Sequence, residues 1–134
     1  MQPPDSRFSS ELTAFAVQQL DALGQTSAGI QLAVLTSEDG FEIAAYRGHA
    51  ISGRIAAMSS SLQALSEAIT REAGLNSPRS LIIEAEGGTI LILGTTVASA
   101  RVSLSVVASS ADTLGQLLWA ARNCCKTLEQ ALQG

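Results

Sequence analysis

The chain has 134 residues, a length that fits one domain with a substantial core. Apolar residues make up 46% of it and charged residues only 15%, which argues against disorder and indicates that part of the outer surface is buried in an oligomer. The net charge of −4, the scattered lysines and arginines and the 4% aromatic content argue against nucleic-acid binding, which needs a cationic track and often stacking rings.

The start of the chain, residues 1–7, is expected to form a flexible N-terminal tail, and residues 8–134 are expected to form a single domain. No basic region followed by an apolar run is present at the start, so no signal peptide is predicted. No apolar run reaches the roughly 20 residues that a membrane span needs. The sequence therefore favours a cytoplasmic protein without direct membrane insertion.

Apolar residues at helical spacing predict a first helix over residues 8–24. Ser9 or Ser10 can cap its beginning, because a hydroxyl oxygen accepts hydrogen bonds from unpaired backbone N–H groups there. Gly24 is the expected C-terminal stop, because helices often end at a glycine.

A hairpin and a long helix follow. Strands are predicted over residues 29–36 and 41–47, joined by a turn at Asp39-Gly40. A second helix is predicted over residues 51–73, with Gly74 as its stop.

The second helix has two different sides. Large apolar residues recur every three or four positions and form one stripe: Ile51, Ile55, Met58, Leu62, Leu65 and Ile69. Small residues form a flatter side: Ala56, Ala57, Ser59, Ser60, Ala64 and Ala68. Because small side chains allow close approach, we expect the flatter side to pack on a neighbouring helix.

Three strands are predicted next, over residues 80–85, 89–94 and 100–108, with a tight turn at Glu86-Gly87-Gly88. The first two of these strands do not alternate between apolar and polar residues. We therefore expect the sheet to be covered on both faces, or on one face by helices and on the other by a partner.

A last helix is predicted over residues 112–132, capped by Ser110 or Asp112. Trp119 falls off the centre of its apolar side and could mark a contact edge. The neighbouring cysteines, Cys124-Cys125, point about 100° apart on a helix. We expect reduced thiols, one buried and one half-exposed.

The order α-β-β-α-β-β-β-α predicts an α+β fold, an α/β sandwich with one five-stranded antiparallel sheet. The first and last helices are expected on one face and the second helix on the other.

This order and several local segments resemble the Roadblock-type (dynein light-chain roadblock) domain, in its bacterial GTPase-accessory kind, over about residues 8–132. Each segment alone is common, but their combination in this order is specific. The segments are Gly29–Leu35, the turn Ser37–Phe41, the helix start Arg54–Met58, Leu81–Gly88 and the pair Leu114-Gly115.

The resemblance implies a dimer, either with a second copy of this chain or with another Roadblock-type chain. In this family the third strands join edge to edge into one continuous sheet, and the second helices pack side by side. The implied interface residues are Leu81, Ile82, Ile83, Ala56, Ser59, Ser60 and Gln63. An apolar edge strand without proline or lysine supports pairing independently, because such an edge otherwise promotes aggregation.

The resemblance also implies a non-enzymatic regulatory or scaffold protein beside a Ras-like small GTPase, tuning its nucleotide cycle or its localisation. Arg54 and Arg71 are possible GTPase contacts, although exposed arginines without such a role are common. The chain has no GxxxxGK[ST] loop, so it is not expected to bind nucleotide phosphates itself.

Two alternatives stay open. A small-molecule sensor could hold a ligand between sheet and helix. An enzyme would need clustered titratable residues, whereas His49 stands alone and the carboxylates Glu84 and Glu86 are expected at a solvated strand end. We therefore predict no catalytic, cofactor-binding or metal site.

Overall fold

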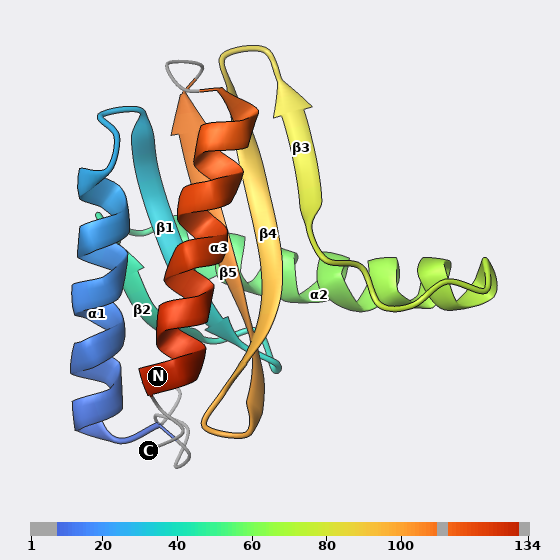
Figure 1. The fold of residues 1–134 in the computed structure, drawn as a ribbon, viewed down its shortest axis with the longest axis horizontal. Coiled ribbons are helices and arrows are strands. Elements are labelled where there is room, and N and C mark those ends of the chain that lie inside the picture. Colours follow the sequence, from blue (N-terminus) through green and yellow to red (C-terminus); the bar gives the residue numbers. More distant parts are fainter. Residues whose placement is uncertain (1–7, 110–112, 132–134) are drawn as a thin grey trace.

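The computed structural model describes residues 8–109 and 113–131 (Figure 1). The predicted tail at residues 1–7 and the predicted caps Ser110 and Asp112 lie outside these residues. The elements follow the predicted order: α1 (Ser10–Gln25), β1 (Ile30–Ser37), β2 (Glu42–Tyr46), α2 (Ser52–Glu72), β3 (Leu81–Ala85), β4 (Gly88–Val97), β5 (Ala100–Ser109) and α3 (Leu114–Ala131).

The five strands form one antiparallel sheet in the order β2-β1-β5-β4-β3. Helices α1 and α3 cover one face, and α2 crosses the other face and extends beyond the sheet past β3 (Figure 1). The fold class, the placement of the helices and the edge position of β3 are confirmed.

The main core lies between the sheet and the α1–α3 layer. Leu20, Leu104 and Leu128 have no exposed surface there. In the central pair β1–β5, Leu35 lies opposite Leu104 and faces this core, while Val34 lies opposite Ser105 and faces α2. Side chains of successive residues point to opposite faces, so one face of the sheet carries the apolar core and the other carries α2.

Gly24 does not end α1, which continues to Gln25. A Cβ atom on Gly24 would lie 2.2 Å from the Tyr46 ring, so glycine is needed there for the close approach of α1 to β2. The prediction of a stop at Gly74 is correct. Gly74 has φ 77°, and the Leu75 N–H donates to the Thr70 carbonyl at 2.8 Å, which satisfies the helix end.

The β4–β5 hairpin is longer than predicted. Strand β4 continues to Val97, and its turn uses Ala98 and Ser99 with φ values of 53° and 65°. Such turns usually carry glycine or asparagine. Ala98 and Ser99 therefore carry no turn signal that the sequence could show.

Candidate functional site

Strand β3 is an open sheet edge. It pairs only with β4, and Ile82 and Ile83 are exposed in the isolated chain. Ile82 lies opposite Leu91, on the α3 side of the sheet, and Ile83 lies opposite Ile90, on the α2 side. The outer backbone N–H and C=O groups of β3 face away from the sheet and can pair with another strand.

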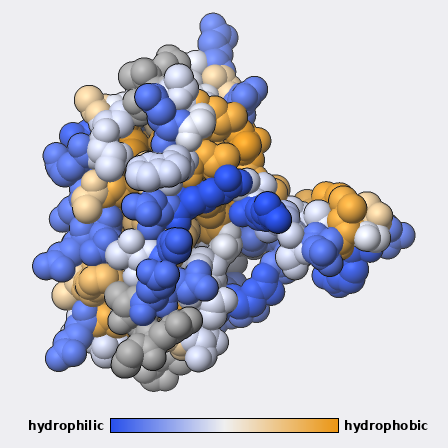
Figure 2. Space-filling model, in the orientation of Figure 1, coloured by the Kyte–Doolittle hydropathy of each residue, from blue (hydrophilic) through white to orange (hydrophobic). Residues whose placement is uncertain are grey.

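Helix α2 turns its large apolar residues outward. The side chains of Met58, Leu65 and Ile69 are 64%, 58% and 61% exposed. These residues and Ile51 form a continuous row along the helix, which we call the α2 outer stripe. Figure 2 shows hydrophobic surface both over β3 and β4 and along the end of α2 that projects from the sheet.

Part of the small-residue side of α2 packs on the chain's own sheet, while Ala57, Ala64 and Ala68 are exposed. Ala56 and Ser59 are buried, and the Ser59 hydroxyl lies 2.8 Å from that of Ser105 on β5. In the isolated chain, Ala56 and Ser59 therefore offer almost no surface for the dimer contacts predicted there. Small side chains do allow close approach, and at these two positions the approaching element is the sheet of the same chain.

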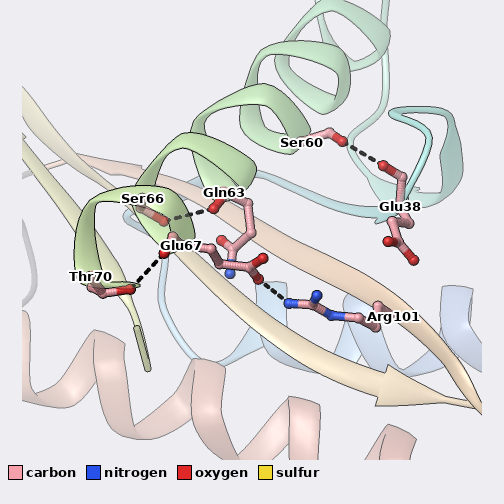
Figure 3. Close-up of polar contacts among 7 residues, drawn as sticks. All are labelled: Glu38, Ser60, Gln63, Ser66, Glu67, Thr70 and Arg101. Atoms are coloured by element: carbon pink, nitrogen blue, oxygen red, sulfur yellow. Dashed lines mark hydrogen bonds and ion pairs between the residues drawn. The ribbon is translucent and has the colours of Figure 1, made fainter. Parts of the chain in front are cut away.

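Ser60 and Gln63 also lie on the side of α2 that faces the chain's own sheet. The Ser60 hydroxyl donates to the Glu38 carbonyl at 2.8 Å (Figure 3), and the Gln63 amide lies over Gly94 of β4. Gly94 leaves room for it, because a Cβ there would be 2.7 Å from Gln63 Nε2. These two half-buried side chains thus hold α2 to its own chain, and the α2 outer stripe adds further candidate partner contacts.

A polar cleft of about 420 Å³ separates the second half of α2 from β4 and β5. Across it, Arg101 of β5 forms an ion pair with Glu67 of α2 (Figure 3). Gln63, Thr96 and Ser103 also line the cleft. Hydroxyl, amide and charged groups therefore converge here, in a space large enough for a small polar molecule.

Arg54 and Arg71 are both exposed on α2. They are roughly 25 Å apart at 1.5 Å per residue, so they cannot reach the same point on a partner. Arg54 adjoins the α2 outer stripe, about 40° around the helix from Met58. Arg71 lies in the last turn, where its charge also favours the helix dipole.

The remaining titratable residues do not assemble a reaction centre in the described part of the chain. His49, Glu84 and Glu86 are each exposed; His49 lies before α2, whereas Glu84 and Glu86 lie at the end of β3. Among residues 8–109 and 113–131, no group of three His, Cys, Asp or Glu side chains is placed to hold a metal ion. Nor is any helix in these ranges long and apolar enough to cross a bilayer.

Both cysteines of α3 are buried, which corrects the prediction of one half-exposed thiol. Cys124 approaches the Gln19 carbonyl of α1 at 3.7 Å, and Cys125 belongs to the same core. Burial raises the pKa of Cys124 to about 11. Burial, with smaller effects of Cys124 and Glu129, raises that of Cys125 to about 12. Neither thiol is activated as a nucleophile.

A family model, the Roadblock/LC7 domain, matches residues 16–108, from the middle of α1 to the end of β5. The chain belongs to the Roadblock/LC7 domain family. The match includes α2 and β3, the two elements whose apolar residues are exposed. No curated protein sequence matches this chain significantly.

Several solved structures share the Roadblock/LC7 fold. Myxococcus xanthus MglB has a TM-score of 0.81 at 16% identity, with 94% of this chain and 92% of that chain covered. An MglB described as having a tetrameric arrangement has a TM-score of 0.84 at 14% identity, with 98% of both chains covered. A Roadblock/LC7 domain from Streptomyces avermitilis has a TM-score of 0.76 at 20% identity, covering 88% and 98%.

Proposed function

We propose that this Roadblock/LC7 protein is a dimeric, non-enzymatic regulator or scaffold that acts in the cytoplasm. It binds a Ras-like small GTPase and tunes the nucleotide cycle of that GTPase or its localisation. The observation that carries the proposal is the α2 outer stripe beside the open edge of β3, within a chain of this family. A solitary chain would leave both apolar surfaces in water.

Dimer formation follows from this arrangement. Leu81, Ile82 and Ile83 of one chain pair antiparallel with the same strand of a second copy, or with another Roadblock-type chain, and produce one continuous sheet. The α2 outer stripe adds apolar contact beside the paired strands. A specific interface buries about 1,600 Å² in total, which one strand and one helix per chain can supply. The tetrameric arrangement described for a similar MglB supports self-association.

The GTPase is proposed to dock on the paired α2 helices. Arg54 and Arg71 would contact different parts of it, because of their separation along the helix. Both would provide long-range attraction and hydrogen bonds at the edge of the apolar contact, where charged residues mainly set the association rate. The chain contributes surface and charge to this complex, and the GTPase holds the nucleotide.

The test is affinity capture from the native cell extract with a non-hydrolysable GTP analogue or with GDP. The wild-type chain is compared with Arg54→Glu and, as a charge-preserving control at the same position, Arg54→Lys. We expect a Ras-like GTPase to be enriched with the analogue, to be weakened by Arg54→Glu and to be retained by the control. Absence of any GTPase in both nucleotide conditions would contradict the proposal.

The polar cleft favours one second candidate, a small-molecule sensor. Glu67 and Arg101 present opposite charges across it, which suits a small ligand that carries both charges. Native mass spectrometry of the purified protein decides between the two. A retained mass that is lost in Arg101→Ala would support the sensor, and a bare polypeptide mass supports the regulator.

A further inference from the structure

Trp119 is the most exposed large apolar side chain of the described residues, at 70%, and the chain's one tryptophan. It stands on the outward side of α3, which belongs to the layer opposite α2 (Figure 1). Tryptophan is a strongly enriched residue at the energetic centres of protein interfaces. The α2 outer stripe cannot account for it, because the sheet lies between the two surfaces.

A hollow of about 480 Å³ lies beside Trp119, between the end of α1 and the beginning of α3. Thr26, Ser27 and Ile30 form its α1 side, and Gln116 and Ala120 form its α3 side. The hollow is therefore wide enough to accept an aromatic side chain from outside, although Trp119 already borders it.

The outward charges of the two helices differ in sign along the middle of this face. Helix α1 exposes Asp21, while α3 exposes Arg122 and Lys126. Glu11 and Glu129, the other charged residues exposed on these helices, lie toward the opposite end. A surface with acid on one helix and base on the other is complementary to a copy of itself turned by two-fold rotation.

The levels of these residues along the helices match. Helices α1 and α3 run antiparallel (Figure 1), and the contact of Cys124 with the Gln19 carbonyl sets these two residues at one level. Arg122, two residues before Cys124, is then level with Asp21, two residues after Gln19. By the same step of 1.5 Å per residue, Trp119 is level with the end of α1, where the hollow opens.

We propose that the α1–α3 face binds a second copy of this chain across a two-fold axis parallel to the helices. The axis places α3 of one chain over α1 of the other. Arg122 and Lys126 then face the partner's Asp21, and the Trp119 ring enters the partner's hollow. Two-fold symmetry forms each contact twice, so few residues supply a large share of the binding free energy.

This surface is separate from the β3 edge and the α2 outer stripe and does not depend on the proposed GTPase. A chain that uses both surfaces joins dimers into larger assemblies. The low charged content of 15% is consistent with such extensive covering of the surface.

Tryptophan fluorescence gives the first test, because Trp119 is the sole reporter in the chain. We expect its emission to shift to shorter wavelength as protein concentration rises, since the ring leaves water. The Ile82→Lys variant, in which the β3 contact is broken, should retain this shift. Emission that is independent of concentration up to the millimolar range would overturn the proposal.

Sedimentation in the Ile82→Lys background gives the second test. Trp119→Ala should weaken the remaining association on the order of 30-fold, the loss typical of an interface centre. Trp119→Phe, the conservative control, should lose less. An association constant unchanged by Trp119→Ala would also overturn the proposal.

A charge reversal tests the two-fold geometry itself. In the same background, Arg122→Glu/Lys126→Glu leaves both helices acidic, and Asp21→Arg leaves both basic. Neither variant should associate with itself, but a mixture should form a heterodimer, because each α1–α3 contact then joins opposite charges. A mixture that stays monomeric would contradict this geometry.

If Trp119 became shielded only on addition of a GTPase, the face would belong to that partner and the proposal would fail.

Discussion

The two sides of the sheet are built in opposite ways. Between the sheet and α1–α3, large apolar side chains such as Leu20 and Leu104 meet one another and are fully buried. Between the sheet and α2, small and polar side chains such as Ser59 and Ser105 meet, and the large residues of α2 point outward. The first side holds the chain together by itself. The second side leaves apolar side chains of α2 exposed, and the proposed dimer would cover them.

The largest effect of this difference is expected on stability. Leu104→Ala should lower the free energy of unfolding by about 2–5 kcal/mol, because it leaves a cavity in the core. Leu65→Ala in the α2 outer stripe should change the stability of the dissociated chain by less than about 0.5 kcal/mol, since its side chain is exposed there. Urea denaturation in the Ile82→Lys background, which removes the β3 contact, compares the two. Equal losses would contradict the division into two sides.

The second prediction concerns assembly through β3. Ile82→Lys should split the β3 dimer, because it places a charge beside an apolar layer in a paired strand. Ile82→Val keeps the shape and the strand preference and serves as the control. Light scattering at low micromolar concentration should show a smaller mass for the lysine variant only. Unchanged mass would mean that β3 is not in the interface.

The third prediction concerns the close approach of α1 to β2. Gly24→Ala should destabilise the chain by roughly 1–3 kcal/mol, since its Cβ would overlap the Tyr46 ring and force the two elements apart. Gly53→Ala is the matched control, because no atom lies within 4 Å of a Cβ at that helical position. Thermal unfolding should show a lower midpoint for the first and an unchanged or higher midpoint for the second. Similar midpoints would show that the Tyr46 ring can move aside at little cost in free energy.

At neutral pH the smallest effect is expected from titration of the buried thiols, because both are protonated there in the folded and in the unfolded chain. Their pKa values are raised from 9.0 to about 11 and about 12, so the folded chain holds these protons more tightly than the unfolded chain. The resulting stabilisation is complete below pH 9 and is lost as pH rises from 9 toward 11, by at most about 1.4 kcal/mol per pH unit for each thiol. Urea unfolding against pH should show a shallower decline in Cys124→Ala/Cys125→Ala. An identical decline would assign the effect to other groups.

Much of the fold could be predicted from the sequence, because hydrophobic periodicity and turn residues act locally. The stop at Gly74 and the turn at Asp39-Gly40 rest on backbone conformations that few other residues adopt. The Ala98-Ser99 turn was not predicted, because alanine and serine have no preference for the positive φ values that this turn requires. The paired strands β4 and β5 hold the two residues in that conformation. The role of Gly24 was predicted wrongly, because the residue that requires a glycine there, Tyr46, is distant in the sequence.

The interaction surface was predicted only in part, and the reason is physical. Periodicity divides α2 into a large-residue side and a small-residue side, but it does not say which side meets the chain's own sheet. The usual rule that large apolar residues face the core fails for Met58 and Leu65, whose side chains are exposed. The usable signal was on the sheet: Ser103 and Ser105 of β5 are small, so the small side chains of α2 can approach the sheet closely there.

The most direct test of the account is amide hydrogen exchange at β3, residues Leu81–Ala85, measured with the sedimentation mass at low micromolar concentration. The account predicts a mass above that of one 13.8 kDa chain and slow exchange at the outer N–H groups of β3; Ile82→Lys should lower the mass and abolish the slow exchange. A wild-type chain that sediments alone, with these N–H groups exchanging as fast as in the variant, would contradict it.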